Sequence, residues 1–562
     1  MNKKKLGKQK GRLLDSAALL EVQELMLDMP RRKDLLIEVL HLIQDEYHFL
    51  STKHLVALAF EMKLAHTEVY EVATFYHHFD VIKENETPPP PLTVRVCESL
   101  TCEMSGAKEL TDALKHIFPE GSASAEQIRI QPVPCVGRCQ HAPVAVVGMN
   151  PVDEATPESV KNCVEKKEIQ PALPEYINFA NYQNSGGYQL YQDCVSGKRD
   201  AESVITELKN SGLRGLGGAG FPAGSKWEIV RKFPGPRLMA INIDEGEPGT
   251  FKDRYYLETD PHRFLEGSLI AAWAVGIDEI YIYLRDEYAA AREILLREIG
   301  ELQSAFPDSL AQIHLRRGAG AYICGEESAM IESIEGKRGI PRLRPPYVAE
   351  VGLFGRPTLE HNMETLHWVR DIIEKGAESF SSHGRRGRKG PRAFSVSGRV
   401  NKPGVHLAPA GISMRELIDE YCGGMLPGHT FYGYFPGGAS GGMLPASLGD
   451  LPLDFDTLQE HGCFIGSAAV VVFSDQDNAR ELALNAMKFF EHESCGQCTP
   501  CRVGTAKAIP LMEQKNWNQA LLEELSQTME DASICGLGQA APNPLRCVMK
   551  YFPQEVDRKS VV

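Results

Sequence analysis

Two pairs of cysteines early in the chain have the residue type and spacing to hold a metal centre. Cys97 is followed by Cys102, and Cys135 by Cys139, and each pair comes directly after an apolar segment that predicts a short strand. Four thiolates on two neighbouring loops can surround a metal. Zinc ribbons use comparable pairs, and the plant-type ferredoxin spacing does not match. The spacing alone therefore leaves zinc and a [2Fe–2S] cluster as equal alternatives.

A second cysteine group lies near the C-terminus. Cys495, Cys498 and Cys501 are separated by two residues each, and Cys535 follows after a long segment with helical patterning. A close triplet with one remote cysteine is typical of a [4Fe–4S] cluster, whereas zinc, the alternative here, usually takes pairs. Among the cysteines outside both groups, five are expected to be ordinary thiols: Cys163, Cys194, Cys422, Cys463 and Cys547.

The stretch 211–227 is rich in glycine and contains Lys226 near its end. Glycines remove Cβ atoms from one side of a loop, so that backbone N–H groups can approach a phosphate, beside which a lysine supplies positive charge. Gly215, Gly217 and Gly220 fit the G-x-G-x-x-G pattern, but the preceding segment has helical rather than strand patterning. The stretch is therefore not the dinucleotide fingerprint. A flexible glycine loop is the alternative interpretation.

The composition narrows the classes of function. The chain has 562 residues, enough for roughly three or four domains, and its formal net charge of −15 argues against nucleic acid as the main partner. The sequence has no apolar run of about 20 residues, the length that spans a bilayer. The basic segment 1–12 lacks an apolar stretch behind it, so we expect a solvated tail and no secretory signal. Grouped cysteines indicate a reducing compartment, and we expect a cytoplasmic protein.

Helical patterning dominates the segment before the first cysteine pairs. Apolar residues recur with a period near 3.6 between residues 14 and 80, which predicts a series of helices. The four prolines at 88–91 predict a stiff linker. Beyond it we expect three short strands, at 92–96, 128–133 and 144–147, and a helix at 107–117. Residues 150–200 are polar and contain several prolines, so we expect a connection between domains there.

The region after residue 200 alternates strands, glycine-rich turns and helices. Strands are expected at 237–243, 279–284 and 312–315, and helices at 289–303 and 328–334. This is the α/β pattern, in which ligands bind beyond the carboxyl ends of strands. Asp244, Glu245 and Glu247 follow the first of these strands. Such a cluster suits either a metal site of oxygen ligands or a hydrogen-bonding rim for a ribityl chain or a nicotinamide ribose.

The segment His66–Tyr76, with the sequence HTEVYEVATFY, precedes the first cysteine pairs, and the second pair stands in the sequence CVGRCQHAP. Together these motifs resemble the 24-kilodalton-type subunit of respiratory complex I. The resemblance implies a helical N-terminus and a thioredoxin-like domain with one [2Fe–2S] cluster, and it favours that cluster over zinc. All four ligand positions of the family are present: Cys97, Cys102, Cys135 and Cys139.

Three motifs after residue 200 occur in the order and at the spacing of a second family. They are the glycine stretch, the block DEGEPGT that begins at Asp244, and the block CGEE that begins at Cys324. Together they resemble the 51-kilodalton-type flavoprotein subunit of complex I, over about residues 200–550. The resemblance implies a Rossmann-like domain that binds FMN and NADH, a ubiquitin-like β-grasp domain, and a helical domain whose [4Fe–4S] cluster is held by Cys495, Cys498, Cys501 and Cys535.

The resemblance also implies roles for individual residues. Lys226 lies close to both FMN and NADH, His361 is a candidate contact to the FMN phosphate, and Phe221 stacks on the adenine with Tyr347 opposite. Glu247 and Glu327 are implied to bind the nicotinamide nucleotide. The positions implied to bind FMN are Gly215, Gly217, Gly218, Asn242, Asp244, Glu245, Tyr322, Glu326 and Asn362, with Gly325 and Thr365 in the same set.

Two positions depart from the family pattern. Leu216 stands where the family usually has arginine, and Glu360-His361-Asn362 replaces a more usual apolar-Asn-Asn sequence. The first departure removes an expected guanidinium near FMN, and the second puts the contact of His361 in question.

The two resemblances together predict a diaphorase module made by the fusion of two complex I-type subunits. NADH gives up a hydride and iron–sulfur clusters accept single electrons, so FMN is needed between them. Hydride passes directly between nicotinamide and flavin, so no catalytic acid or base is expected. The sequence shows no ligand set for a [NiFe] centre and no membrane segment for quinone, so a partner must provide the other substrate.

Fusions of this kind resemble the β subunits of NAD-dependent formate dehydrogenases that contain molybdenum or tungsten. This implies a catalytic α subunit with its own iron–sulfur clusters as the partner. The first alternative is the diaphorase subunit of an NAD-reducing hydrogenase or of a complex I-like enzyme. A second alternative, a cluster-bearing scaffold with an inactive flavin site, is suggested only by Leu216 and Glu360.

The expected fold is α/β and multidomain. Its parts are a helical N-terminal segment (1–87), a thioredoxin-like [2Fe–2S] domain (92–165), a linker (166–200), an FMN- and NADH-binding domain (201–380), a ubiquitin-like domain (381–470) and a helical [4Fe–4S] domain (471–562). A basic run at 385–392 is expected to be an exposed loop, with an acidic partner as the alternative explanation.

Overall fold

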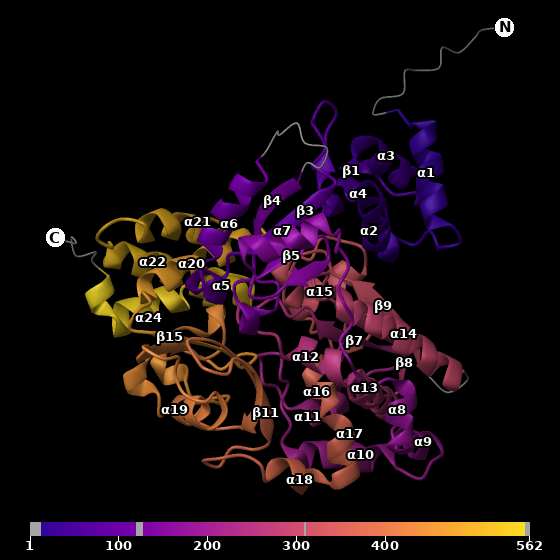
Figure 1. The fold of residues 1–562 in the computed structure, drawn as a ribbon. Helices are drawn as coiled ribbons and strands as arrows, with labels where there is room; N and C mark the ends of the chain where they lie inside the picture. Colours follow the sequence, from indigo (N-terminus) through magenta and orange to yellow (C-terminus); the bar gives the residue numbers. More distant parts are fainter. Residues whose placement is uncertain (1–12, 120–127, 308–310, 557–562) are drawn as a thin grey trace.

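The computed structural model describes residues 13–119, 128–307 and 311–556, so the basic tail expected at 1–12 lies outside the described residues. Helices α1 (Ser16–Met26), α2 (Leu36–Tyr47), α3 (Thr52–Glu61) and α4 (His66–Ala73) open the described chain, as the apolar spacing predicts. Asp15 caps α1 by accepting hydrogen bonds from the N–H groups of Ala17 and Ala18. The four helices pack against one another at the upper right of the molecule (Figure 1).

A four-stranded sheet carries the first cysteine group. Its strands are β3 (Leu92–Cys97), β4 (Ile128–Val133), β5 (Ala145–Val147) and β6 (Asn150–Val152), in the order β4-β3-β5-β6. Strands β3 and β4 run parallel, and the other neighbours run antiparallel. Parallel strands end at the same edge of a sheet, so Cys97 and Cys135 are brought together there. Helices α6 (Ala107–Ile117) and α7 (Pro157–Glu165) pack on this thioredoxin-like sheet.

The segment 166–200, which the sequence suggests is a linker, contains two helices, α8 (Phe179–Asn184) and α9 (Gln189–Val195). These pack on α14 (Ala289–Ala305) and α13 (Pro261–Val275) of the next domain. The hydroxyl of Tyr182 donates a hydrogen bond of 2.6 Å to the buried Glu266. The second half of this segment is therefore part of the following domain rather than a simple connection.

The next domain is built on a parallel sheet of four strands. These are β7 (Arg237–Ile243), β8 (Ile277–Leu284), β9 (Gln312–Arg317) and β10 (Thr358–Asn362), in the order β10-β7-β8-β9. The sequence predicts the first three strands but not β10, because the residues of β10 are mostly polar although largely buried. The chain moves outward from β7 to β9 and returns to the opposite side of β7. This reversal creates a switch point between β7 and β10, where open α/β sheets bind ligands.

Helices connect and cover this parallel sheet. Besides α13 and α14, they are α10 (Ala201–Ser211), α11 (Ala223–Arg231), α12 (Lys252–Thr259), α15 (Glu327–Ile334), α16 (Met363–His367), α17 (Val369–Lys375) and α18 (Ala377–Ser381). Helix α15 packs on β7 and β8, and α16 packs on β7 and β10. Helix α13 is buried along almost its whole length, because its apolar residues occur on all sides.

A second, mixed sheet follows. Its strands are β11 (Pro391–Gly398), β12 (Gly404–Pro409), β13 (Phe431–Phe435), β14 (Leu444–Pro445) and β15 (Ala469–Ser474), in the order β12-β11-β15-β13-β14. The central strands β11 and β15 run parallel, and the outer strands pair antiparallel with their neighbours. The short α19 (Met414–Glu416) and the helical turn that continues it lie between β12 and β13. This is the β-grasp arrangement that the sequence resemblance implies.

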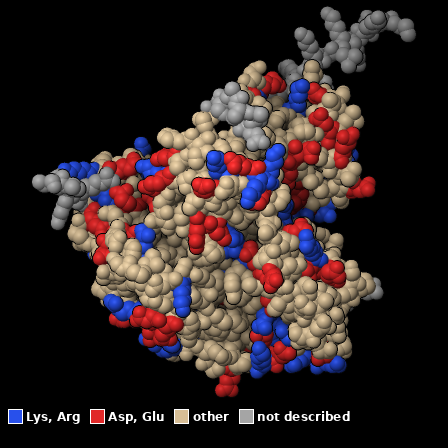
Figure 2. Space-filling model, in the orientation of Figure 1, with Lys and Arg blue, Asp and Glu red and all other residues tan. Residues whose placement is uncertain are grey.

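Four arginines of the basic run at 385–392 form ion pairs within the chain. Arg385 pairs with Glu420 at 2.8 Å and Arg386 with Glu416 at 2.8 Å. Arg388 and Arg392 both pair with Asp454, at 2.8 and 2.6 Å. Figure 2 likewise shows basic and acidic side chains intermixed on the visible face. The structure thus accounts for the basic run without an acidic partner.

Helices form the C-terminal domain, as expected. They are α20 (Ala479–His492), α21 (Thr499–Met512), α22 (Gln519–Ala532), α23 (Gly536–Ala540) and α24 (Asn543–Tyr551), shown in yellow tones at the left of Figure 1. The second cysteine group lies between α20 and α21 and just before α23. Among the described helices, none has both the length and the apolar character that a membrane crossing requires.

Candidate functional site

A central cavity of about 290 Å³ lies at the switch point between β7 and β10. Its walls come from several parts of the chain that are far apart in sequence. They include Gly217 and Gly218 of the glycine stretch, Asn242, Asp244, Glu245, Glu247 and Asn362 at strand ends, Tyr322, Gly325 and Glu326 after β9, Ser440, Phe464 and Gly466 of the β-grasp domain, and Gly536 and Leu537 of the helical domain. The structure therefore brings together most of the residues that the sequence suggests.

The glycine stretch is folded tightly against this cavity. The N–H of Gly215 donates to the carbonyl of Phe221 at 2.8 Å, which closes the loop. The N–H of Leu216 donates to Thr365 Oγ1 at 2.9 Å, so Thr365 holds the loop in place. A Cβ atom on Gly217 would lie 2.9 Å from the Cβ of Asn362. Only glycine leaves the backbone this close to the cavity, which is the cradle that a flavin requires.

A buried cluster of charges forms the floor of the cavity. Lys252 Nζ lies 2.7 Å from Asp253 and 3.1 Å from Glu364, and all three side chains are almost fully buried. Asn362 joins the cluster by donating to Asp253 at 2.7 Å. Burial alone would lower the pKa of Lys252, but the neighbouring carboxylates raise it above its ordinary value. Sequence reasoning missed these three residues, although Lys252 and Asp253 directly follow the acidic block.

The carboxylates of the acidic block have separate environments. Asp244 Oδ2 is buried and has no hydrogen-bond partner in the described part of the chain, and burial raises the pKa of Asp244. Burial, followed by the charge of Asp253, raises the pKa of Glu245 to about 7. Glu245 accepts hydrogen bonds from the N–H of Asp253 at 2.9 Å and from the Tyr288 hydroxyl at 2.7 Å. An unpartnered acceptor that faces the cavity suits a polar ligand rather than an apolar one.

Glu247 connects the parallel sheet to the β-grasp domain. One of its oxygens accepts a hydrogen bond from the Tyr322 hydroxyl, and the other accepts one from the N–H of Ser440 at 2.7 Å. The described Asp244, Glu245 and Glu247 do not converge as metal ligands. Their separate hydrogen bonds favour the rim for a ribityl chain or ribose over the metal site of oxygen ligands.

Several residues expected at the cofactors lie beside the cavity rather than in its wall. Lys226 donates to the carbonyl of Glu360 at 3.0 Å. His361 is buried and accepts a hydrogen bond from the Trp227 indole at 2.8 Å, and burial lowers the pKa of His361. This places His361 in the packing behind the glycine loop. Burial, followed by the charge of Glu327, raises the pKa of Glu360.

The residues expected to bind the nicotinamide nucleotide line the surface near the cavity. Phe221 and Tyr347 are 45% and 59% exposed, which is unusual for large aromatic side chains and leaves their faces open to a planar ring. Arg344 pairs with Glu326 at 2.5 Å and with Glu327 at 2.7 Å. Glu327 is thus held at the start of α15, close to the cavity residue Glu326.

The first cysteine group is assembled and buried. The Sγ atoms of Cys135 and Cys139 are 3.3 Å apart, and the thiols of Cys97, Cys102 and Cys135 neighbour one another. The N–H of Gly137 donates to Cys135 Sγ at 3.4 Å. Four converging thiols with a backbone donor fit a [2Fe–2S] cluster. The group abuts the parallel-sheet domain, because Phe251 packs directly against Cys135 and Cys139.

The second cysteine group stands directly beside the cavity. Cys535 precedes Gly536 and Leu537, which line the cavity wall. Burial raises the pKa of Cys501 to about 11 and of Cys535 to about 12, while the N–H of Leu537 favours the Cys535 thiolate. Cys495, Cys498 and Cys501 interact electrostatically with one another, as does Cys535 with Cys495. This donor set fits a [4Fe–4S] cluster.

The other cysteines that the sequence sets apart lie outside both groups. Cys163, Cys194 and Cys422 are buried thiols. Cys463 and Cys547 are also buried, and their Sγ atoms are 3.6 Å apart. These positions agree with the expectation of ordinary thiols, apart from the proximity of the last two, which the sequence does not predict.

Comparisons with known proteins agree with this geometry. Three family models match the chain: a thioredoxin-like [2Fe-2S] ferredoxin at 22–168, a Nuo51 FMN-binding domain at 208–371, and an NADH-ubiquinone oxidoreductase-F iron-sulfur binding region at 481–559. The chain is 41% identical to an NADH-quinone oxidoreductase subunit of Rhizobium meliloti (strain 1021), over 68% of this chain and 94% of that protein. It is 40% identical to the equivalent NADH-quinone oxidoreductase subunit of Aquifex aeolicus (strain VF5), over 71% of this chain and 95% of that protein.

A solved structure matches nearly the whole chain. A chain of an NAD+-reducing [NiFe]-hydrogenase in the H2-reduced state superposes with a TM-score of 0.82 at 30% identity, covering 94% of this chain and 93% of that one. Fold and site thus define an iron–sulfur flavoprotein of the NADH dehydrogenase type. The chain belongs to the family of 51-kilodalton-type flavoprotein subunits of NADH-quinone oxidoreductase, here fused to a 24-kilodalton-type [2Fe–2S] domain. Its cofactors are FMN, one [2Fe–2S] cluster and one [4Fe–4S] cluster, with NADH as substrate.

Proposed function

We propose that this chain is the diaphorase subunit of an NAD-dependent formate dehydrogenase and exchanges electrons between NAD(H) and a catalytic partner. The main support for a diaphorase function is the position of the central cavity, which lies between the two cysteine groups. Gly536, which lines the cavity, is adjacent to Cys535. On the other side, Arg285 donates to the carbonyl of the cavity residue Glu245 and to that of Cys135.

FMN, when bound, accepts an electron pair as hydride and passes electrons on singly. The chain's own residues position the reactants. Gly217 and Gly218 let the backbone approach the flavin, and Asp244 offers an acceptor to a ribityl hydroxyl. Phe221 and Tyr347 supply aromatic faces for the adenine, while Glu247 and Glu327 are suited to orient ribose hydroxyls. No side chain is assigned a proton in the hydride step, so specificity rests on orientation and on exclusion of water.

The partner assignment rests on the fused architecture. A helical N-terminal segment ending in Tyr70–Tyr76 leads into an intact set of [2Fe–2S] cysteines, as in the β subunits that the sequence resembles. The catalytic α subunit would hold molybdenum or tungsten and its own iron–sulfur clusters. The grouped, unpaired thiols of the described chain support a cytoplasmic complex, because a reducing compartment keeps such thiols available.

A second candidate partner is a [NiFe] hydrogenase. The specific observation in its favour is that the hydrogenase chain covers 94% of this chain, so that protein shares the fused architecture as well. The two candidates differ in the metal of the partner subunit, not in the chemistry at the FMN cavity. A complex I-like partner would contribute iron alone.

The test is the metal content of the native complex, purified anaerobically from its source through a tag on this chain. Molybdenum or tungsten together with iron supports the formate dehydrogenase, and formate should then bleach the flavin. Nickel instead overturns that assignment in favour of the hydrogenase, and hydrogen should bleach the flavin. Iron alone contradicts both partners. A complex of the Cys97→Ser variant serves as the control, because its partner metal should be unchanged while its [2Fe–2S] signal is lost.

A further inference from the structure

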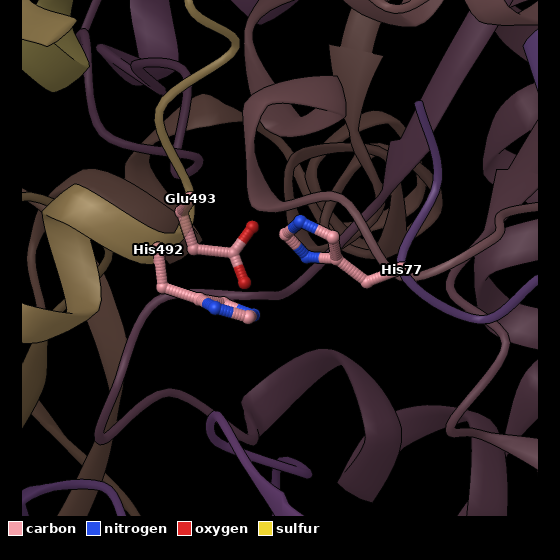
Figure 3. A group of neighbouring side chains, drawn as sticks. All are labelled: His77, His492 and Glu493. Carbon is pink, nitrogen blue, oxygen red and sulfur yellow. The ribbon is translucent and has the colours of Figure 1, made fainter. Parts of the chain in front are cut away.

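Three side chains with metal-ligating atoms converge outside the sites described so far. His77 lies just after α4, and His492 and Glu493 lie at the end of α20. One ligand atom of each lies within 4.8 Å of the others. Figure 3 shows the carboxylate of Glu493 facing the ring of His77, with the ring of His492 beside it. The three residues come from segments more than four hundred positions apart, so the fold, and not local sequence, brings them together.

We propose that His77, His492 and Glu493 bind one divalent transition-metal ion of the zinc class. Two imidazoles and one carboxylate are the ligand set of many zinc sites that keep a fourth position open. Imidazole and carboxylate ligands suit zinc and its neighbours, whereas calcium and magnesium prefer oxygen ligands only. The residues belong to neither cysteine group, so such an ion would be additional to the iron–sulfur clusters.

The hydrogen bonding around the three residues leaves ligand atoms available. Neither imidazole of His77 and His492 has a hydrogen-bond partner in the portion of the chain that is described, and the ring centroids are only 4.2 Å apart. One oxygen of Glu493 accepts a hydrogen bond of 2.9 Å from the N–H of Tyr322, so its second oxygen can bind an ion. A hydrogen-bonded carboxylate ligand of this kind is a common feature of metal sites, because it fixes the ligand's orientation.

The cationic side chains near His77, His492 and Glu493 already have partners. A cavity of about 80 Å³ adjoins the three residues and is also lined by His78, Arg95 and Arg285. Arg285 pairs with Glu287 at 2.7 Å, His78 lies 2.8 Å from Asp286, and Arg95 donates to the carbonyl of Gly148. These cationic side chains already have partners, and water in the cavity can fill the fourth position.

Binding requires only small side-chain movements. Tetrahedral zinc with bonds of about 2.0–2.1 Å places its ligand atoms about 3.3 Å apart. The present separations, within 4.8 Å, shrink to this value by rotation of the histidine side chains. Both histidine side chains are exposed to solvent, which leaves room for that rotation.

The ion would join three parts of the molecule. His77 belongs to the N-terminal helical segment, and Glu493 precedes the [4Fe–4S] ligand Cys495 by one intervening residue. Through Tyr322, Glu493 also contacts the wall of the FMN cavity. A bound ion would therefore hold the N-terminal helices against the [4Fe–4S] domain and raise the midpoint of thermal unfolding as its concentration rises.

The test is zinc binding by the full chain, purified anaerobically with its clusters and flavin and freed of loose metal by a chelator. Zn2+ alone is the probe, and bound zinc per chain is measured by mass spectrometry after desalting. X-ray absorption at the zinc edge reports the ligands. We expect one zinc per chain with nitrogen and oxygen ligands at about 2.0–2.2 Å, and binding weaker by about tenfold or more in His77→Ala and His492→Ala.

The matched control is His66→Ala, which removes an exposed histidine at the start of α4 and should bind zinc as the wild type does. Iron and sulfide contents are measured in every variant. If the His492→Ala variant loses iron, zinc binding by the His77→Ala variant is the decisive measurement, because His77 is remote in sequence from the [4Fe–4S] cysteines. Absence of zinc binding, equal binding by His77→Ala, or sulfur ligands at about 2.3 Å would each overturn the proposal.

Discussion

The guanidinium of Arg285 donates a hydrogen bond of 2.7 Å to the backbone carbonyl of Cys135. The same side chain donates to the carbonyl of Glu245 and pairs with Glu287 at 2.7 Å. One buried cation therefore holds a [2Fe–2S] ligand loop against the wall of the FMN cavity. The [2Fe–2S] domain and the FMN-binding domain belong to different families. Contacts between the two domains, such as those of Arg285, therefore set the distance between the cluster and the FMN cavity.

Replacing Arg285 with methionine should destabilise the chain and release this loop. The change leaves Glu287 and two carbonyls without their donor, which for a buried pair costs roughly 3–5 kcal/mol. We expect a lower thermal midpoint and a broadened or lost EPR signal from the [2Fe–2S] cluster. Arg297→Met, which removes an exposed pair with Glu293 on α14, should change stability by less than about 1 kcal/mol. Equal effects of the two variants would contradict the role of Arg285.

Gly217→Ala should weaken the binding of FMN. The added Cβ atom would lie 2.9 Å from the Cβ of Asn362 and must displace that side chain or the loop. Overpacking of this kind costs about 1–3 kcal/mol, which corresponds to roughly fivefold to a hundredfold in the dissociation constant. Fluorescence titration of the deflavinated chain with FMN measures the effect. Gly300→Ala, where the added atom meets nothing within 4 Å, should bind FMN normally.

Lys252→Met should be the most damaging change in the cavity floor. It leaves the buried carboxylates of Asp253 and Glu364 without their counter-charge, at a cost of roughly 3–5 kcal/mol. Thermal unfolding and retained flavin per chain report the outcome. Lys209→Met removes a half-exposed pair with Glu228 at 3.0 Å and should be nearly neutral. Full flavin content and an unchanged midpoint in Lys252→Met would show that the cluster is not needed.

The raised pKa of Glu245 predicts a pH dependence of stability. The unfolded chain releases this proton near the ordinary value of 4.5, but the folded chain releases it at about 7. This group therefore leaves stability unchanged below pH 4.5, lowers it as the pH rises from 4.5 to 7, and keeps it lowered above 7. Burial raises the pKa of Glu493 to about 7 as well, so its effect has the same sign.

Glu245→Gln should accordingly flatten the decline in thermal midpoint between about pH 4.5 and pH 7, without abolishing it, because Glu493 still titrates. Glu524→Gln on the exposed face of α22 is the control and should retain the full decline. A Glu245→Gln variant with the wild-type pH profile would show that the carboxylate at 245 is ionised throughout this range.

Much of the fold follows from local patterns in the sequence. Apolar periodicity identifies α2 and α20, and apolar runs identify β7 and β8, because these elements bury residues of one kind. The apolar pattern does not predict strand β10, because Glu360 and His361 are polar although they are buried. Their environment is set by Lys226 and Trp227, which are remote in sequence and reach them only through folding.

The residues of the site likewise include some that a local sequence pattern reveals and some that it does not. Spacing reveals the cysteine groups, because cluster ligands repeat at short intervals, and glycine content reveals the loop at Gly217. Spacing does not reveal Glu364, which pairs with Lys252 from α16, or Ser440, which binds Glu247 from the β-grasp domain. Residues that act through a long-range contact carry no local signal.

Electrons from NADH should enter at the FMN cavity and reach both cysteine groups within this one chain. The most direct measurement is an anaerobic titration of the purified chain with NADH, followed by visible absorption for the flavin and by EPR for the two clusters. We predict that NADH bleaches the flavin and that reduced-cluster signals appear, with the [2Fe–2S] signal absent in Cys97→Ser. A chain that holds FMN and both clusters but is not reduced by NADH would contradict it.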